Sequence, residues 1–186
     1  MSVFFYGCIT IDGYLADKNH GLSWLHETGS PEETDCDRFY SEMDVTIMGK
    51  RTFEEIAQLE DAASVYPTTE NYVFTHAASL PRKGFTPVNG DVAEFVEGLG
   101  PDQNIWIIGG NTILAPLLER DMVDHLIIQI APVLLGEGIP LFTQKEGLRR
   151  FRLDVVKRYG QFSELILRKN DVSPCDFLVD NESNLW

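Results

Sequence analysis

The stretch IWIIGGNT, residues 105–112, carries the strongest fold signal in the chain. Its apolar first half predicts a central strand of a parallel sheet, because such strands are buried on both faces. Gly109 and Gly110 would end the strand, and a helix through Leu118 would follow. Glycine lets a ligand approach the backbone, and the N–H groups at a helix start favour an anion. The stretch therefore indicates either a phosphate-binding turn or an ordinary strand–helix turn, and it lacks the GxGxxG dinucleotide-binding pattern.

A second strand–glycine–helix unit, VTIMGKRT, spans residues 45–52. Its basic pair, Lys50 and Arg51, follows the strand end, which is where α/β sheets bind ligands. Lys and Arg together number 15 in the chain, so an adjacent pair at this place is informative. A third predicted strand ends at the polar pair Thr75-His76. Taken together, the three strand ends favour a site for an anionic nucleotide over a solvated pair of cations on a helix.

The rest of the chain alternates between strand-like and helix-like segments, and residues 18–31 are predicted to form a polar loop. Apolar, β-rich runs predict further strands at residues 3–9, 72–75, 85–88, 123–135, 151–159 and 162–168. Helix signals begin at Pro31, at residue 52 and after Asp91, whose side chain would cap its helix. This order predicts an α/β fold with a mostly parallel sheet and antiparallel strands at its C-terminal end.

Composition predicts one globular domain over residues 1–170, followed by a tail of residues 171–186. A hydrophobic content of 44% is that of a folded protein. The net charge of −14 argues against binding to nucleic acids or anionic membranes. We see no secretion leader and no apolar run of about 18 residues. The three cysteines and four histidines lack metal-ligand spacing. We therefore expect a cytoplasmic protein with no metal.

The tail is acidic, yet it carries several large apolar side chains. These are Phe177, Leu178, Val179, Leu185 and Trp186. Complete burial of such a side chain is worth about 1.5–3 kcal/mol, which offsets part of the cost of ordering the chain. We expect the tail to pack on its own domain or across a dimer, with Trp186 at least partly buried. The alternative is a tail that contributes nothing in solution.

Acidic residues gather on the helix that is expected from Pro31. A solvated acidic face is the ordinary reading of Glu32, Glu33, Asp35 and Asp37. Asp35 is the sharper candidate for chemistry, because Phe39, four residues on, shares its helix face. A carboxyl group beside an aromatic ring lies in an apolar environment, which raises its pKa.

The motifs together resemble the dihydrofolate reductase superfamily. Within it they are most similar to the C-terminal reductase domain of bifunctional riboflavin-biosynthesis deaminase/reductase proteins. The matching pieces cover residues 2 to about 169 in the family's order. They are IDGYLA (11–16), IMGKRT (47–52), IGG (108–110), VDHL (123–126) and APVLLGEGIPLF (131–142). The last piece is long and specific, whereas the others are short.

The resemblance implies a three-layer sandwich and a cofactor, NADPH, lying extended across the C-terminal edge of the sheet. It assigns the phosphates and the adenosine end to Gly49, Lys50, Arg51, Thr52, Thr75 and His76. It assigns the pyrophosphate and the nicotinamide to Ile9, Thr10, Gly109, Gly110, Asn111 and Thr112. In this superfamily the Gly–Gly peptide is typically cis. The cations near the adenosine end further imply a preference for NADPH over NADH.

For the substrate side, the resemblance implies Asp35 as the acid that orients and helps to protonate the substrate, with Glu32 as the alternate. Asp12 and Phe39 would contact the substrate. The implied activity is that of an NADPH-dependent oxidoreductase acting on a ribosylaminopyrimidine phosphate or on dihydrofolate. Asp12-Gly13 and residues 136–140 favour the riboflavin branch, but the deaminase domain usually fused to it is missing. The alternative is a non-catalytic relative that binds NADPH.

A homodimer is expected from the run of residues 126–135, which is too apolar for a strand with one wet face. Close relatives in the family pair through this region. Pro116 departs from the family pattern, since it removes a backbone hydrogen bond unless its helix starts late.

Overall fold

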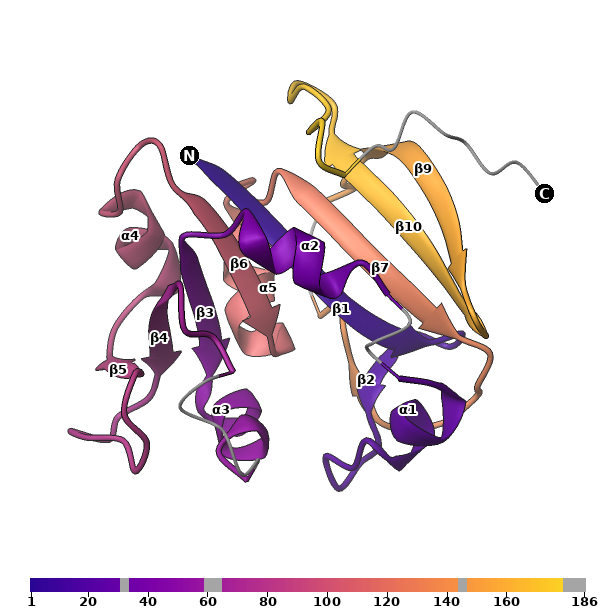
Figure 1. Cartoon of the computed structure of the whole chain (residues 1–186), viewed down its shortest axis with the longest axis horizontal. Coiled ribbons are helices and arrows are strands. Elements are labelled where there is room, and N and C mark those ends of the chain that lie inside the picture. Colours follow the sequence, from indigo (N-terminus) through magenta and orange to yellow (C-terminus); the bar gives the residue numbers. More distant parts are fainter. Residues whose placement is uncertain (31–33, 59–64, 144–146, 179–186) are drawn as a thin grey trace.

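A single sheet organises the chain in the computed structural model, which describes residues 1–30, 34–58, 65–143 and 147–178 (Figure 1). Within these ranges the sheet order is β5-β4-β3-β6-β1-β7-β10-β9. The strands are β1 (Ser2–Thr10), β3 (Val45–Gly49), β4 (Glu70–Phe74), β5 (Thr86–Val88), β6 (Asn104–Gly109), β7 (His125–Ala131), β9 (Phe151–Tyr159) and β10 (Phe162–Lys169). Neighbours from β5 to β7 run parallel, and β10 is antiparallel to both β7 and β9. The predicted sheet is therefore confirmed.

Helices α4 (Val92–Glu97) and α5 (Asn111–Glu119) cover one face of the sheet. Alternate residues of the central strands, such as Val3 and Phe5 of β1, point into this layer and meet Leu114 and Leu117 of α5. Asp91 caps α4 as predicted, because its carboxylate accepts hydrogen bonds from two backbone N–H groups of the first turn. Pro116 lies inside α5 rather than before it.

The opposite face carries α2 (Cys36–Ser41) and α3 (Lys50–Ile56). Phe39 of α2 stands edge-on to Tyr6 of β1 and to Trp106 of β6, with ring centroids 5.0 and 5.3 Å apart. Phe53 of α3 packs on Met48 and on the strands beside it. Two helical layers therefore enclose the sheet, which is the expected three-layer arrangement.

A short two-stranded sheet and one more helix stand beside the main sheet, and the sequence did not predict them. The two strands are β2 (Tyr14–Ala16) and β8 (Ile139–Pro140). Helix α1 (Ser23–Thr28) lies in the segment expected to be a polar loop. Trp24 of this helix is buried against Ala131 and Phe162, so tertiary packing stabilises a helix that local sequence does not specify.

Strand β7 corrects the reason given for a dimer. It lies between β1 and β10, and both of its edges are hydrogen-bonded within the chain. Its apolar composition is therefore explained by burial on both faces of an interior strand. The outer strand at this end of the sheet is β9, which exposes 53% of Leu153 and 45% of Val156.

The described part of the tail packs on its own domain. Leu178 is 6% exposed and lies in the same cluster as Phe4 and Phe39, while the Phe177 ring contacts Phe4. The expectations for Val179, Leu185 and Trp186, and for Pro31 and Glu32, fall outside the described residues. Among the helices that are described, none has the length and apolarity that crossing a membrane requires.

Candidate active site

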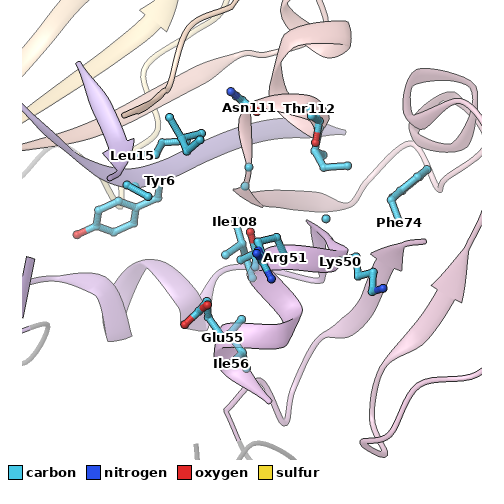
Figure 2. Close-up of a pocket in the computed structure, with 18 of the residues that line it drawn as sticks. Tyr6, Leu15, Lys50, Arg51, Glu55, Ile56, Phe74, Ile108, Asn111 and Thr112 are labelled. Atoms are coloured by element: carbon cyan, nitrogen blue, oxygen red, sulfur yellow. The ribbon is translucent and has the colours of Figure 1, made fainter. Parts of the chain in front are cut away.

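A cavity of about 1040 Å³ lies along the carboxyl ends of β3, β4 and β6 and continues beside the middle of β1. Gly49, Phe74 and Gly109 line it at the three strand ends. Figure 2 shows Lys50 and Phe74 at one end of the view and Tyr6 and Leu15 at the other. A cavity of this size and place is typical of a small-molecule site in an α/β protein.

The glycine turn between β6 and α5 forms one wall of the cavity. The Gly109–Gly110 peptide is cis, as the resemblance implied, and Gly109 has a φ of 136°, which side chains rarely allow. A Cβ atom on Gly110 would meet no atom within 4 Å, so this backbone faces open space. No side chain caps the start of α5. The turn and the uncapped start of α5 line the cavity, and backbone of this kind suits a phosphate.

The cationic end of the cavity is formed by the first residues of α3. Lys50 Nζ lies 3.6 Å from one carboxylate oxygen of Glu54, and Arg51 Nη1 lies 3.1 Å from the other. Both cations are more than half exposed, so Glu54 orients them without removing them from solvent. Thr75 and His76, which follow β4, line the same cavity.

Most of the residues proposed for the cofactor are brought together here. The cavity is lined by Gly49, Lys50, Arg51, Thr52, Thr75, His76, Gly109, Gly110, Asn111 and Thr112. Ile9 and Thr10 are instead buried in β1. The Thr10 hydroxyl donates to Asp12 at 2.6 Å rather than facing the cavity. Asn111 Nδ2 donates to the Pro140 carbonyl at 2.9 Å and so ties the start of α5 to β8.

The other half of the cavity is mainly apolar. Leu15, Leu22, Leu25, Trp106, Ile108 and Phe162 line it together with the histidines His20 and His26. Such a lining can hold a flat ring and exclude water from it.

A buried polar cluster interrupts this apolar half. Gln129 Nε2 donates to the Tyr6 hydroxyl at 2.8 Å and to Glu164 Oε2 at 3.0 Å. The Tyr6 hydroxyl lies 2.9 Å from the same carboxylate oxygen, which closes a triangle. Burial raises the pKa of Glu164 above its ordinary value, and burial also raises the pKa of Tyr6. Tyr6 and Gln129 line the cavity, and Glu164 stands directly behind them.

Three of the residues expected on the substrate side, Asp35, Phe39 and Asp12, are not among the residues that line this cavity. The Asp35 carboxylate accepts from Lys157 Nζ at 3.1 Å and from the Tyr159 hydroxyl, both on β9, outside the large cavity. Phe39 is in the core of the α2 layer, and Asp12 binds the backbone of the loop after β7.

The polar cluster was missed by sequence reasoning because its members come from three strands far apart in the chain. A signal did exist. Gln129 is the one amide in the apolar strand HLIIQIA, and Glu164 falls between Phe162 and Ile166 on the buried face of β10. Polar residues at buried strand positions mark a site or a satisfied network.

Three comparisons with known proteins agree with this architecture. The uncharacterized protein YwjB of Bacillus subtilis (strain 168) is 31% identical over 165 residues, which are 86% of this chain and 93% of that protein. A putative riboflavin biosynthesis protein from Shewanella sp. PV-4 superposes with a TM-score of 0.80 at 22% identity, covering 91% of this chain and 99% of that one. Dihydrofolate reductase from Enterococcus faecalis, solved in complex with NADP(H), superposes with a TM-score of 0.62 at 14% identity, covering 91% and 97%.

The two structural likenesses establish the fold, which is the dihydrofolate reductase-like sandwich expected from the sequence. Residues 2–163 match the description "RibD C-terminal domain", a span that includes the glycine turn, the cationic end and the apolar half of the cavity. Together with the likeness to YwjB, this match confirms the expected resemblance. The chain therefore belongs to the RibD C-terminal domain family.

Proposed function

We propose that this protein is an NADPH-dependent reductase of a small heterocyclic or ribosylated pyrimidine compound. Its reaction would resemble that of 5-amino-6-(5-phosphoribosylamino)uracil reductase or dihydrofolate reductase. The observation that supports this most directly is one continuous cavity with a glycine cradle and two cations in one half and an apolar lining in the other. A charged dinucleotide and a flat ring need these two environments side by side.

The residues of the cavity fit NADPH. Open space at the Gly110 backbone and the uncapped start of α5 suit a pyrophosphate. Lys50, Arg51 and His76 line the same cavity, and their side chains could give a 2′-phosphate charge-assisted hydrogen bonds. The bound cofactor would supply the hydride, and the chain would supply orientation and exclusion of water. The E. faecalis enzyme, which shares the fold, was solved with NADP(H), and this adds support.

Cofactor binding is tested by thermal unfolding of the protein with NADPH and, separately, with NADH. Saturation about a hundredfold above the dissociation constant stabilises a protein by about 2.7 kcal/mol. We expect a rise in melting temperature with NADPH that exceeds the rise with NADH. No rise with either nucleotide would contradict the proposal.

Catalysis is tested by following the oxidation of NADPH with dihydrofolate and with the ribosylaminopyrimidine phosphate as substrates. Turnover of one of them supports the reductase. The second candidate function is a non-catalytic relative that binds NADPH, and it is favoured by the displacement of Asp35 from the cavity. Binding of NADPH without turnover of either compound would select it.

A homodimer formed through β9 is part of the same proposal. This edge strand exposes Leu153 and Val156, and an edge strand with exposed apolar residues favours pairing with another chain.

A further inference from the structure

The triangle of Tyr6, Gln129 and Glu164 places a buried acid one hydrogen bond away from the cavity. The three side chains project from β1, β7 and β10, which are neighbours in the sheet. Their hydrogen bonds span 2.8–3.0 Å. Thr34 also hydrogen-bonds the Tyr6 hydroxyl from the segment before α2. The acid is 2% exposed, so its contact with the cavity runs through the Tyr6 hydroxyl and the Gln129 amide.

We propose that Tyr6 is the catalytic residue that hands a proton to the substrate, and that Glu164 supplies this proton through the Tyr6 hydroxyl. The proposal rests on the reductase function proposed above. It moves the acid from Asp35, which the sequence favoured, to Glu164 of β10.

The step balances as follows. A C=N bond of the substrate breaks its π bond, accepts the hydride at carbon and takes the Tyr6 proton at nitrogen. The Tyr6 oxygen takes the proton of the Glu164 carboxyl group in the same event, so the tyrosine is neutral before and after. The substrate is reduced by two electrons and NADPH is oxidised to NADP⁺. The Glu164 carboxylate regains a proton from water after the product has left.

The relay through Tyr6 follows from the electrostatics of the site. Burial and the neighbouring Glu164 raise the pKa of Tyr6, so a free tyrosinate is strongly disfavoured there. A proton must therefore pass through this hydroxyl rather than simply leave it. Burial also raises the pKa of Glu164, which favours the protonated carboxyl group that the relay needs.

The titratable groups that act on Glu164 are Tyr6 on β1, Lys157 on β9, and Asp35 and Cys36 at the start of α2. Strand β7 contributes the neutral amide of Gln129. Hydrogen bonds from Gln129 and Tyr6 and the charge of Lys157 lower the pKa of Glu164, whereas Asp35 raises it. Because Lys157 is paired with Asp35 at 3.1 Å, their opposite effects on Glu164 partly cancel and burial dominates.

Tyr6→Phe is the first test, because it removes the hydroxyl and keeps the ring that packs on Phe39. We expect kcat to fall by about 10²–10⁴-fold with the substrate that supports turnover, as for loss of a general acid. The melting-temperature rise caused by NADPH should stay as in the unchanged protein. Tyr159→Phe is the matched control, since it also removes a hydroxyl bonded to a carboxylate, but outside the cavity. Equal kcat values for Tyr6→Phe and Tyr159→Phe would overturn the role of Tyr6.

Glu164→Gln tests the source of the proton through the pH profile. In the unchanged protein kcat should fall as the pH rises through the pKa of Glu164, because the carboxyl group loses the proton that it must donate. The Gln variant should show a low kcat without that decline. An unchanged decline in Glu164→Gln would assign it to another group and overturn the role of Glu164.

A measurement on the resting protein decides the same point without turnover. Isotope-edited infrared or carbon NMR titration of the glutamates, assigned by loss of the signal in Glu164→Gln, gives the pKa of Glu164. We expect it above 4.5 and higher still in Tyr6→Phe, because the lost hydrogen bond no longer stabilises the carboxylate. A pKa at or below 4.5 overturns the proton relay alone. Failure of NADPH to bind, or of both compounds to turn over, counts against the proposed function instead.

Discussion

At the scale of single residues, Arg51 carries the expected choice between cofactors. Arg51 lines the cavity beside Lys50 and forms an ion pair with Glu54, so its charge is available to a ligand only in part. A charge-assisted hydrogen bond is worth about 1.5–3 kcal/mol, and an exposed one is worth less. We expect Arg51→Ala to weaken the binding of NADPH about tenfold, which corresponds to about 1.4 kcal/mol. The affinity for NADH should fall much less, because NADH lacks the 2′-phosphate.

The measurement is a titration of each variant with both nucleotides, followed by fluorescence or calorimetry. Arg152→Ala is the control, since this arginine is an exposed cation on β9 outside the cavity. Equal losses of NADPH and NADH affinity in Arg51→Ala would show that the arginine does not read the phosphate.

Individual site residues were predictable where the signal is local. Gly49 and Gly109 are the last residues of β3 and β6, and a helix begins directly after each turn, so a strand–glycine–helix pattern suffices to place them. Tyr6 and Glu164 are 158 positions apart, and their contact depends on the order of the strands. The position of Asp35 outside the large cavity was not predictable for a related reason, because a shared helix face with Phe39 does not say which neighbouring strand the helix meets. It meets Lys157 of β9.

At the scale of elements, Asp12 joins the turn after β1 to the loop after β7. Its carboxylate accepts hydrogen bonds from Thr10 Oγ1 at 2.6 Å and from the backbone N–H groups of Leu135 and Gly136. The hydrogen bond from Thr10 contributes most to a lowered pKa of Asp12. The resulting stabilisation is therefore complete above the unfolded-state pKa of about 3.9 and is lost as the pH falls through the lower folded-state pKa.

We expect Asp12→Asn to lower the melting temperature at neutral pH and to reduce the further loss on acidification. Thermal unfolding between neutral and strongly acidic pH measures both effects. Asp102→Asn, at an exposed position, is the control and should follow the unchanged protein. If Asp12→Asn and Asp102→Asn had the same melting temperatures throughout, the carboxylate would not hold the two loops together.

Long elements were predictable from sequence, whereas short ones were not. The apolar runs of β1, β3 and β6 and the cap of α4 are signals several residues long. Strand β8 has two residues and α1 has six, so neither shows a full period of any pattern. Their stability comes from partners distant in sequence, such as Phe162 under Trp24. Isolated helices of this length are not stable in water.

At the scale of the whole molecule, β9 decides the expected assembly. A register shift in the β9–β10 pair leaves Asp154 with no residue opposite it on β10. Leu153 and Val156 therefore fall on the same face of β9. Both side chains are exposed on the outermost strand. We expect light scattering at micromolar concentration to give twice the chain mass of 21.0 kDa. Leu153→Lys should shift the mass towards that of the monomer.

The control for this experiment is Leu148→Lys, which adds the same charge at an exposed leucine outside β9. A monomer mass for the unchanged protein would contradict the dimer. Dimers that persist equally in Leu153→Lys and Leu148→Lys would move the interface away from β9.

The order of the strands could not have been derived from local patterns. β1 enters the middle of the sheet between β6 and β7, which follow it by about a hundred residues. The alternation of strands and helices and the family resemblance predicted the class of fold, whereas the strand order comes from the structure. The tail has no counterpart in the family. Its predicted position therefore rested on the physical argument that burial of its apolar side chains is favourable.

The tail offers the last test of the whole molecule. Leu178 is buried with Phe4, Tyr6 and Phe39, the aromatic group on which α2 and the proton relay depend. Replacing a buried leucine by alanine costs about 2–5 kcal/mol, and in a chain of this size each kcal/mol lowers the melting temperature by about 2–4 °C. We expect Leu178→Ala to lose at least 4 °C by this arithmetic, and deletion of residues 172–186 to lose as much or more. Asp176→Ala, at an exposed position of the tail, should change little. Melting temperatures unchanged by both Leu178→Ala and the deletion would mean that the tail does not cover the core in solution.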